Sequence, residues 1–549
     1  MRSRTKKVLS VISLLCVLAL AFSGCGSGEG TGGSTTADPD NSGTSASQGS
    51  VGDSKLNTEG FPIAKEKTTF SLFGAKNSIQ GAWKDLKFFK IMEQKTNIAF
   101  EFDTPTWDVW NEKKNIVFAG GQYPDVFFGG ALSPQEEVRY GSQGILIPLE
   151  SLIDEYAPNI KKMFEEMPEV KSSVITPDGH IYALPLVNKV FCNETTWYNV
   201  EWLNALGVKE VPTTVEGMHD LLLRMKNEDP NGNGQKDEIP LSLCNKGATF
   251  GIQILPAFGI LSQNFYIQDD KVHYGYLEKN YPEFIKFINT LWKEGLIDSE
   301  AFIQDQPKMI SKTKDNKVGL VTISVPQLAY NITDLNLAKN YPLLPAMSSS
   351  KSGSRLAPMT TGIGRGAFSI TSNCKNPEML IRWIDYVYSE EGSMLVHFGE
   401  EGDLFKYLDN GLKQYIQPAD GRSIEEYRGG TITPDCGTPV PKWVREENEI
   451  KWDDPFQQYR VDTIGSELRQ YSQVPLPDMY FTNEEQLKID PILADLDKYV
   501  KEMEVKFYVG AESAENYGKF AETIKKIGAD DVIKVYQAAY DRWKENSSK

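Results

Sequence analysis

Histidine and cysteine are scarce in this sequence, with four and six occurrences in 549 residues. The histidines show no metal-ligand spacing, which argues against a zinc motif; they are His180, His219, His273 and His397. No Cys-x-x-Cys pair occurs. Cys16 and Cys25 lie near the N-terminus, and the other four are isolated: Cys192, Cys244, Cys374 and Cys436. Disulfides can form in exported proteins, but this spacing names no partners and favours buried free thiols.

Catalytic and phosphate-binding motifs are also missing. The sequence has no Gly-x-Ser-x-Gly elbow, no zinc-protease helix and no phosphate loop. The glycine cluster Gly362-Ile-Gly-Arg-Gly366 has Ala367 at the sixth position, where a dinucleotide fingerprint needs glycine. A strand pattern follows it, so we interpret this cluster as a hinge turn. Because 75 residues are acidic, a pair of glycosidase carboxylates stays open as an alternative.

Positive charge is in deficit, since 58 basic residues face 75 acidic ones and the formal net charge is −17. Loss of residues 1–24, which carry four basic residues and no acid, would take the charge to −21. Such an acidic chain argues against nucleic-acid binding, which requires basic patches. No fixed-period repeat and no second apolar run of membrane-spanning length occur. The length predicts two or more domains.

An export signal opens the chain. Residues 1–24 have a basic start and then a long apolar run. The small residues before Cys25 resemble a lipobox, in which this cysteine is diacylated and becomes the mature N-terminus, although Phe22 stands where leucine is usual. A plain secretory signal and an uncleaved anchor are the alternatives. Residues 25–58 are rich in Gly, Ser and Thr, which predicts a flexible tether holding the folded part near a membrane that it does not enter.

A calcium loop is the strongest local signal. Residues 229–238 place oxygen-bearing groups at loop positions 1, 3, 5, 7, 9 and 10, with glycines between them where the backbone turns. Calcium prefers six to eight such oxygen ligands. The loop departs from an EF-hand because position 12 is Pro240 and a strand follows, which favours a structural ion over a sensor; a solvated turn is the alternative. The expected ligands are Asp229, Asn231, Asn233, the Gln235 carbonyl, Asp237 and Glu238.

Strand and helix patterns alternate after residue 61. We expect strands at 68–73, 98–102 and 124–128, with helices at about 83–95 and 107–119 between them. Units of this kind predict an α/β fold with a largely parallel sheet. Ligands bind at the carboxyl ends of the strands in such sheets, so the loops after residues 73, 102 and 128 are the first candidates for a site.

Several motifs together resemble the extracellular solute-binding proteins of family 1, in their large lipoprotein branch. The first are Gln122-Tyr-Pro-Asp-Val126, Ile145-Leu-Ile-Pro-Leu149 and Asp178-Gly-His-Ile-Tyr-Ala-Leu-Pro185. The others are Tyr198–Gly207 with Val211-Pro-Thr-Thr214, Asn376–Tyr386 and Val535–Trp543. The loop 229–238 is similar to the calcium site of oligosaccharide-binding members. The resemblance covers the chain from about residue 61 to its end.

The resemblance implies a two-lobe, periplasmic-binding-protein-like α/β fold with hinge crossovers and a helical C-terminal extension. Lobe 1 would comprise residues 59–184 and 360–400. Lobe 2 would comprise residues 185–359 and 401–549, including the calcium loop. It further implies a lipid-anchored, monomeric receptor outside the membrane, without enzymatic activity. The receptor would capture a saccharide, with an oligosaccharide favoured, and deliver it to the permease of an ATP-binding-cassette (ABC) importer.

Aromatic side chains near strand ends and lobe boundaries are the candidate solute contacts, because aromatic faces stack on sugar rings in a closed cleft. The same residues could be core or rim aromatics. The set is Trp83, Trp107, Trp110, Trp197, Tyr198 and Phe250, with Asp125 as the first polar candidate. A surface glycoside hydrolase and a rigid carbohydrate-binding or peptide-binding adhesin are the alternative functions.

Overall fold

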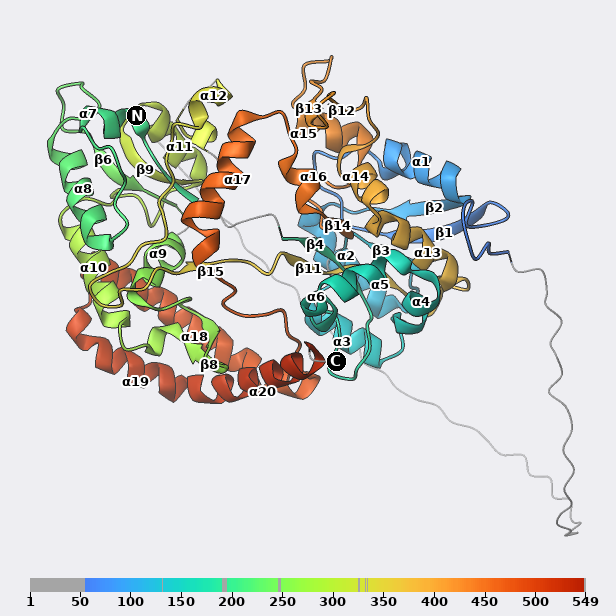
Figure 1. The fold of residues 1–549 in the computed structure, drawn as a ribbon. Coiled ribbons are helices and arrows are strands. Elements are labelled where there is room, and N and C mark those ends of the chain that lie inside the picture. The colour runs from blue at the N-terminus through green and yellow to red at the C-terminus, as the bar shows by residue number, and fades with distance from the viewer. Residues whose placement is uncertain are drawn as a thin grey trace, which may run out of the picture. The chain divides into compact units, whose positions relative to one another are not determined.

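The computed structural model describes residues 55–130, 132–189, 195–244, 248–323, 326–330, 332 and 334–547. The expected signal peptide, Cys25, nearly all of the tether and Cys192 lie outside the described residues. Residues 54–549 form one compact unit, which holds two main β-sheets. We call each sheet with its helices a lobe (Figure 1). Among the described helices, none has the length and apolar content to cross a membrane.

The first lobe is built on a six-stranded sheet in the order β14-β4-β11-β3-β1-β2. Strands β1 to β2 and β1 to β3 are parallel, and β11 is antiparallel to β3 and β4. The strands are β1 Thr68–Phe73, β2 Ile98–Asp103, β3 Val126–Phe128, β4 Leu184–Asn188, β11 Ile363–Ile370 and β14 Lys442–Val444. The expected strand–helix alternation at the start of the chain is therefore confirmed.

Helices cover this sheet because their apolar sides are buried against it. Trp383 on α13 contacts the rings of Phe88, Phe100 and Phe128, and this cluster forms the core of the first lobe. These helices are α1 Lys87–Thr96, α2 Trp107–Gly120, α3 Pro134–Ser142, α4 Glu150–Tyr156, α5 Pro158–Glu166, α6 Pro168–Ser172, α13 Pro377–Tyr388 and α14 Glu390–Phe398. Two further short helices are α15 Ile424–Tyr427, which has no buried residue, and α16 Glu446–Ile450. A hairpin of β12 Phe405–Tyr407 and β13 Lys413–Tyr415 follows α14.

The second lobe contains a three-stranded sheet in the order β5-β9-β6, formed by Thr195–Tyr198, Val318–Ile323 and Ile239–Ser242. A hairpin of β7 Phe265–Gln268 and β8 Lys271–Tyr274 lies in the same lobe. Two short strands, β10 Ala357–Pro358 and β15 Ser472–Gln473, pair separately. The helices are α7 Val200–Ala205, α8 Val215–Asn227, α9 Ala248–Gln253, α10 Tyr281–Lys293, α11 Gln306–Lys314, α12 Leu335–Ala338 and α17 Pro455–Glu467.

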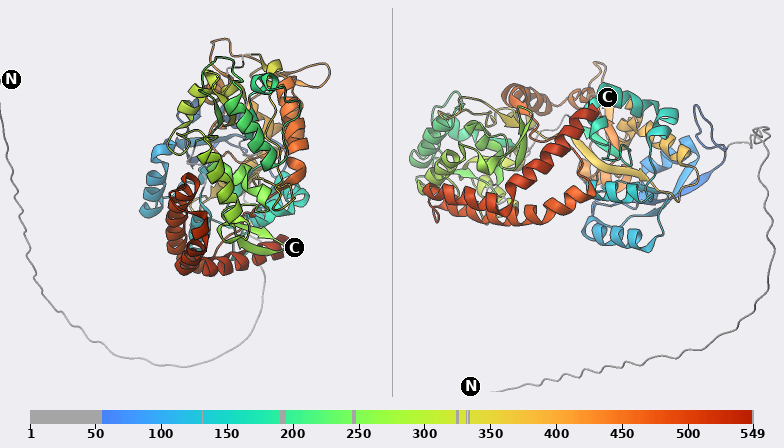
Figure 2. Two further views of the ribbon diagram at one scale, coloured as in Figure 1. Left: turned by 90° about the vertical axis from the view of Figure 1, so that its left-hand side faces the viewer. Right: turned by 90° about the horizontal axis from the view of Figure 1, so that it is seen from below.

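The helical C-terminal extension is confirmed. It consists of α18 Asn483–Val509, α19 Tyr517–Ile527 and α20 Ala529–Ser547, drawn in red in Figures 1 and 2. Helix α18 packs on α10, and its Leu496 and Val500 are buried in the core of the second lobe. Helix α20 contacts both β8 and α6, so the extension touches both lobes.

The expected lobe boundaries need two corrections. Strand β4 belongs to the six-stranded sheet, so the first lobe continues to residue 188 instead of ending at 184. Strand β14 pairs with β4 in the same sheet, although the sequence analysis assigned 401–549 wholly to the second lobe. The reason is physical: β14 has three residues, all buried, and a strand this short leaves no readable alternation.

Candidate functional site

In an α/β sheet, ligands bind at the loops that follow the carboxyl ends of the strands. Here these are the loops after β1, β2 and β3, and we call this side of the sheet its carboxyl edge. The loop after β1 begins at Gly74, where an added Cβ would lie 2.3 Å from the carbonyl oxygen of Phe128. Only glycine lets the backbone pass this close to β3. Helix α2 begins at the same edge, four residues after β2 ends, and carries Trp107 as its first residue.

A segment that is distant in the sequence closes this edge. The side-chain amide of Gln80 is buried and donates to the carbonyl oxygen of Cys436 at 2.8 Å and to the hydroxyl of Thr438 at 3.0 Å. Its own oxygen accepts a hydrogen bond from the indole nitrogen of Trp83 at 2.8 Å. Sequence reasoning missed Gln80 and residues 433–438, because no local pattern connects positions more than 350 residues apart.

Trp107 is the predicted aromatic residue that the structure places at this edge with a half-exposed ring. Its indole nitrogen donates to the carbonyl oxygen of Gly437 at 3.0 Å. Its backbone N–H donates to the carbonyl oxygen of Lys76, so loops after β1 and β2 are joined here. Trp107 therefore stays a candidate contact for a solute.

The other predicted aromatics are core residues in this structure. Trp83, Trp110 and Phe250 are each 1% exposed, and Trp197 and Tyr198 are fully buried. Trp110 stacks on Phe73. The hydroxyl of Tyr198 has no hydrogen-bond partner, and burial raises its pKa. None of these five rings offers a free face, so the alternative of a packing role describes them.

Asp125 lies at the start of β3, away from the carboxyl edge, whereas we expected it at a strand end. Its carboxylate accepts two hydrogen bonds of 2.7 Å from Ser71, one from the backbone N–H and one from the hydroxyl. Both bonds end on Oδ2, so this oxygen of the carboxylate joins the start of β3 to β1. The structure therefore assigns Asp125 a role in holding the sheet together.

The backbone of the loop 229–238 turns sharply at three residues with positive φ. Gly232 and Gly234 adopt φ of +68° and +71°, and Asp229 adopts +49°. The Asp229 carboxylate accepts hydrogen bonds from the N–H groups of Asn233 and Gly234, at 3.2 and 3.0 Å. The amides of Asn231 and Asn233 both donate to Asp237, which also pairs with Lys317 at 3.1 Å. These hydrogen bonds thus link four of the six predicted ligand residues within the loop.

The hydrogen bonds of the loop leave one side-chain oxygen of Glu238 without a partner. Its Oε1 atom is buried and has no hydrogen-bond partner. Burial raises the pKa of this carboxyl group, and the nearby charges of Asp229 and Asp237 raise it further. An oxygen in this situation is costly unless a proton or a cation compensates it. Counted as His, Cys, Asp or Glu alone, the described residues hold no group of three suited to a metal.

The loop connects a helix to a strand. Helix α8 precedes it and is capped by Thr214, whose hydroxyl accepts from the N–H of Gly217 at 3.1 Å. The strand that was expected after the loop is present as β6.

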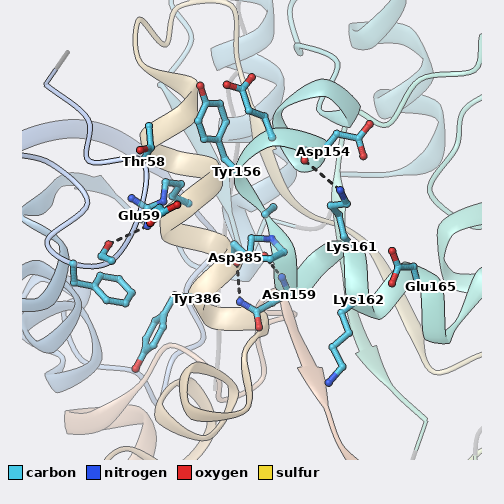
Figure 3. A pocket seen from close by; sticks show the side chains of 16 residues that line it. Thr58, Glu59, Asp154, Tyr156, Asn159, Lys161, Lys162, Glu165, Asp385 and Tyr386 are labelled. Carbon is cyan, nitrogen blue, oxygen red and sulfur yellow. Dashed lines mark hydrogen bonds between the residues drawn. The ribbon is translucent and has the colours of Figure 1, made fainter. Parts of the chain in front are cut away.

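A cavity of about 720 Å³ lies elsewhere on the first lobe, between α5, α13 and residues 58–61 (Figure 3). One buried polar group of its lining is already paired: Asp385 accepts from Asn159 and from the N–H of Ile160, as the dashed lines in part show. Burial raises the pKa of Asp385 to about 6. Because this cavity is built from helices and lies away from the strand ends, we do not assign it as the solute site.

Cysteine placement agrees in part with expectation. Cys374 and Cys436 are free thiols, and Cys436 is buried. Burial raises the pKa of each of these two thiols to about 12, so neither is a reactive thiolate at neutral pH. Cys244 is buried at the end of β6.

Comparison with known proteins now settles the family. The profile of the bacterial extracellular solute-binding proteins matches residues 74–394, more than half of the chain. The chain belongs to this family. The family resemblance inferred from the sequence motifs is therefore confirmed, as is the two-lobe fold class.

The most informative relative is the fructooligosaccharide ABC transporter substrate-binding protein FusA of Streptococcus pneumoniae serotype 4. It is 30% identical over 526 residues, which cover 90% of this chain and 94% of FusA. The structure of FusA in complex with kestose has a TM-score of 0.70 at 27% identity, covering 87% of this chain and all of that one. A FusA EF-hand mutant in complex with fructo-nystose has a TM-score of 0.71 at 26% identity, covering 87% and 100%.

Two further relatives are more distant. Lipoprotein LipO of Bacillus subtilis strain 168 is 21% identical over 451 residues, covering 78% of this chain and 84% of LipO. An extracellular solute-binding protein of Bifidobacterium longum subsp. infantis has a TM-score of 0.76 at 22% identity, covering 88% and 99%. This last likeness concerns the fold alone.

Proposed function

We propose that this solute-binding protein captures an oligosaccharide, of the fructooligosaccharide class, and delivers it to the permease of an ABC importer. The observation that carries the proposal is the 30% identity to FusA across nearly the whole length of both chains. The function implied by the sequence resemblance, capture of a saccharide, is here narrowed to one class. The protein would act as a monomer and without turnover of the solute.

The carboxyl edge of the first lobe is the proposed solute contact. Trp107 would stack on a sugar ring, and the half-exposed Lys76 and Asn77 beside it would hydrogen-bond hydroxyl groups. A solute that touches both lobes shifts their balance only by binding the closed state better than the open one. Binding should therefore be coupled to closure of the lobes.

Calcium is the proposed structural ion of the loop 229–238. Glu238 would offer its unpaired Oε1, Asp229 and Asp237 their carboxylates, Asn231 and Asn233 their amide oxygens, and Gln235 its backbone carbonyl. Two observations support this assignment. The Oε1 atom of Glu238 is buried without a hydrogen-bond partner, and the negative charges of Asp229 and Asp237 act on the same carboxyl group. The ion would tie α8 to β6 and take no part in contacting the solute.

Anchoring is proposed at Cys25. Its acylation would hold the protein on the extracellular face of the cell membrane, with residues 25–58 as the flexible tether. The lipobox-like residues before Cys25 support this, and so does the lipoprotein name of the relative LipO. The anchor would keep the captured solute close to the permease.

A thermal-shift screen tests the function. Ligands that bind only the folded state raise its melting midpoint, so kestose and nystose should raise it while maltotriose and an oligopeptide pool should not. X-ray scattering with saturating kestose should show compaction, and chromatography should recover the sugar intact. Cleaved sugar would identify a glycoside hydrolase, binding without compaction a rigid adhesin, and a shift with the peptides alone a peptide receptor.

A further inference from the structure

Trp107 is held by its indole nitrogen as well as by its backbone. The hydrogen bond from this nitrogen to the carbonyl oxygen of Gly437 is 3.0 Å long. On its other side the ring meets Trp110 edge to face, with centroids 6.2 Å apart. Trp110 is itself fixed between Phe73 and the backbone of Gly130, where an added Cβ would lie 2.7 Å from the indole. The ring of Trp107 therefore has one defined orientation.

Gly437 can accept this bond only while its own segment stays in place. Its φ of +68° is a left-handed conformation, and an added Cβ would lie 2.4 Å from the amide nitrogen of Asn77. Gln80 donates to two carbonyl oxygens that precede Gly437 in the same segment, those of Pro434 and Cys436, at 2.5 and 2.8 Å. Thr438 donates to the carbonyl oxygen of Ala75 at 3.3 Å. Residues 433–438 are thus fastened to the loop after β1.

A buried ionic cluster fastens the same segment from the side of the core. Asp435 contacts Lys442 on β14 and His397 on α14, and Arg428 lies 3.4 Å from the same oxygen. Burial alone would raise the pKa of Asp435, but the positive charge of Lys442 and the other partners hold it well below its usual range. The carboxylate is therefore held in its ionised form beside these cations, which ties residues 433–438 to α14 and β14.

We propose that Gln80 and residues 433–438 are positioning elements that set the orientation of the Trp107 ring toward the solute. This inference rests on the proposed function. A tryptophan anchored in one rotamer before binding loses less conformational freedom when a sugar stacks on it, which is the general advantage of a preorganised site. Gly437 acts through its backbone carbonyl, and Gln80 acts through Gly437 without touching the solute.

Two substitutions of Trp107 separate stacking from positioning. Trp107→Ala removes the ring and should weaken kestose binding roughly ten- to a hundredfold, the range for stacked aromatic contacts. Trp107→Phe keeps an aromatic face but loses the bond to Gly437, and should weaken binding roughly three- to tenfold, the range for one hydrogen bond. Trp292→Phe, at a half-buried position on α10 of the second lobe, is the matched control and should bind like wild type.

Gln80→Leu tests the positioning element itself. In protein carrying ¹⁵N-labelled tryptophan, the indole N–H signal of Trp107 is identified by its loss in Trp107→Phe. Gln80→Leu should shift that signal and increase its solvent exchange, and should weaken kestose binding threefold or more. A purely structural role would lower the melting midpoint and leave the signal unchanged, which would overturn the proposal.

The outcomes distinguish this inference from the function on which it rests. If wild type binds no saccharide, the proposed function fails and the inference with it. If wild type binds kestose and Trp107→Phe binds equally well, the function stands and the positioning role is refuted. Because Trp107→Phe changes a half-exposed side chain, this result can be read even if Gln80→Leu does not fold.

Discussion

Glu137 offers a prediction whose size can be worked out from the structure. It lies on α3, is fully buried, and accepts a hydrogen bond of 2.7 Å from the hydroxyl of Tyr480 in the segment that leads into α18. Its Oε1 atom has no partner. Burial raises the pKa of Glu137 from 4.5 to about 7, against the lowering effects of Arg365 and Tyr480. This acid therefore sits where the first lobe meets the C-terminal extension.

The sign of the effect on stability follows from proton uptake. Between pH 4.5 and 7 the folded protein keeps Glu137 protonated while the unfolded chain ionises it, so the folded state binds more protons and stability falls as pH rises. Below pH 4.5 both states are protonated and the loss is absent, whereas above pH 7 the loss is complete. At 1.36 kcal/mol for each pH unit, the full loss is about 3 kcal/mol. The charged groups that act on Glu137 are Arg365 on β11, which lowers its pKa, and Glu136 on α3, which raises it.

Glu137→Gln is neutral at every pH and removes this dependence. Urea unfolding of wild type and variant at several pH values gives the difference between their free energies of unfolding, and any constant cost of the glutamine amide cancels from its slope. We expect this difference to change by about 3 kcal/mol between pH 4.5 and 8. Glu112→Gln, at an exposed position on α2, is the control and should give a flat difference. A flat difference for Glu137→Gln as well would refute the reasoning.

Three further predictions follow from single features. Chelation should lower the melting midpoint, calcium should restore it better than magnesium, and Asp229→Ala should abolish this response. A melting midpoint that does not change with chelator would contradict calcium binding and support the alternative of a solvated turn. Cys25→Ala should release the protein from membranes and from lipid labelling, whereas retained label would contradict the anchor. Gly366→Ala puts a Cβ 2.1 Å from the Leu132 carbonyl oxygen at φ +69° and should cost at least about 1 kcal/mol in urea unfolding. Gly465→Ala, with open space around it, should cost nothing.

Local patterns in the sequence predicted much of the fold. Strands β1 and β2 and helix α2 were predicted because apolar spacing over six or more residues reports burial directly. The turn at 229–238 was predicted because its glycines and oxygen-bearing residues are adjacent in the sequence, and calcium at this turn stays a prediction. Contacts across long separations were not predicted: Gln80 and Cys436 are more than 350 positions apart, and the three buried residues of β14 show no period.

The sequence also could not separate aromatic residues that contact a solute from those that pack in the core. Aromatic residues near strand ends can face a cleft or the core, and composition does not separate these cases. Trp107 is half exposed because it opens α2 at the sheet edge, whereas Trp110, one turn further along, faces Phe73 and is buried. Asp125 directly precedes Val126, the first residue of β3, so it lies at the amino end of that strand and not at its carboxyl edge.

Calorimetric titration of the acyl-free protein with kestose, followed by chromatography of the sugar, tests the central claim most directly. The account predicts saturable binding with one kestose per chain, a negative heat-capacity change from burial between the lobes, and recovery of the sugar unchanged. An absence of binding to kestose and to nystose, or recovery of fructose released from either, would contradict it.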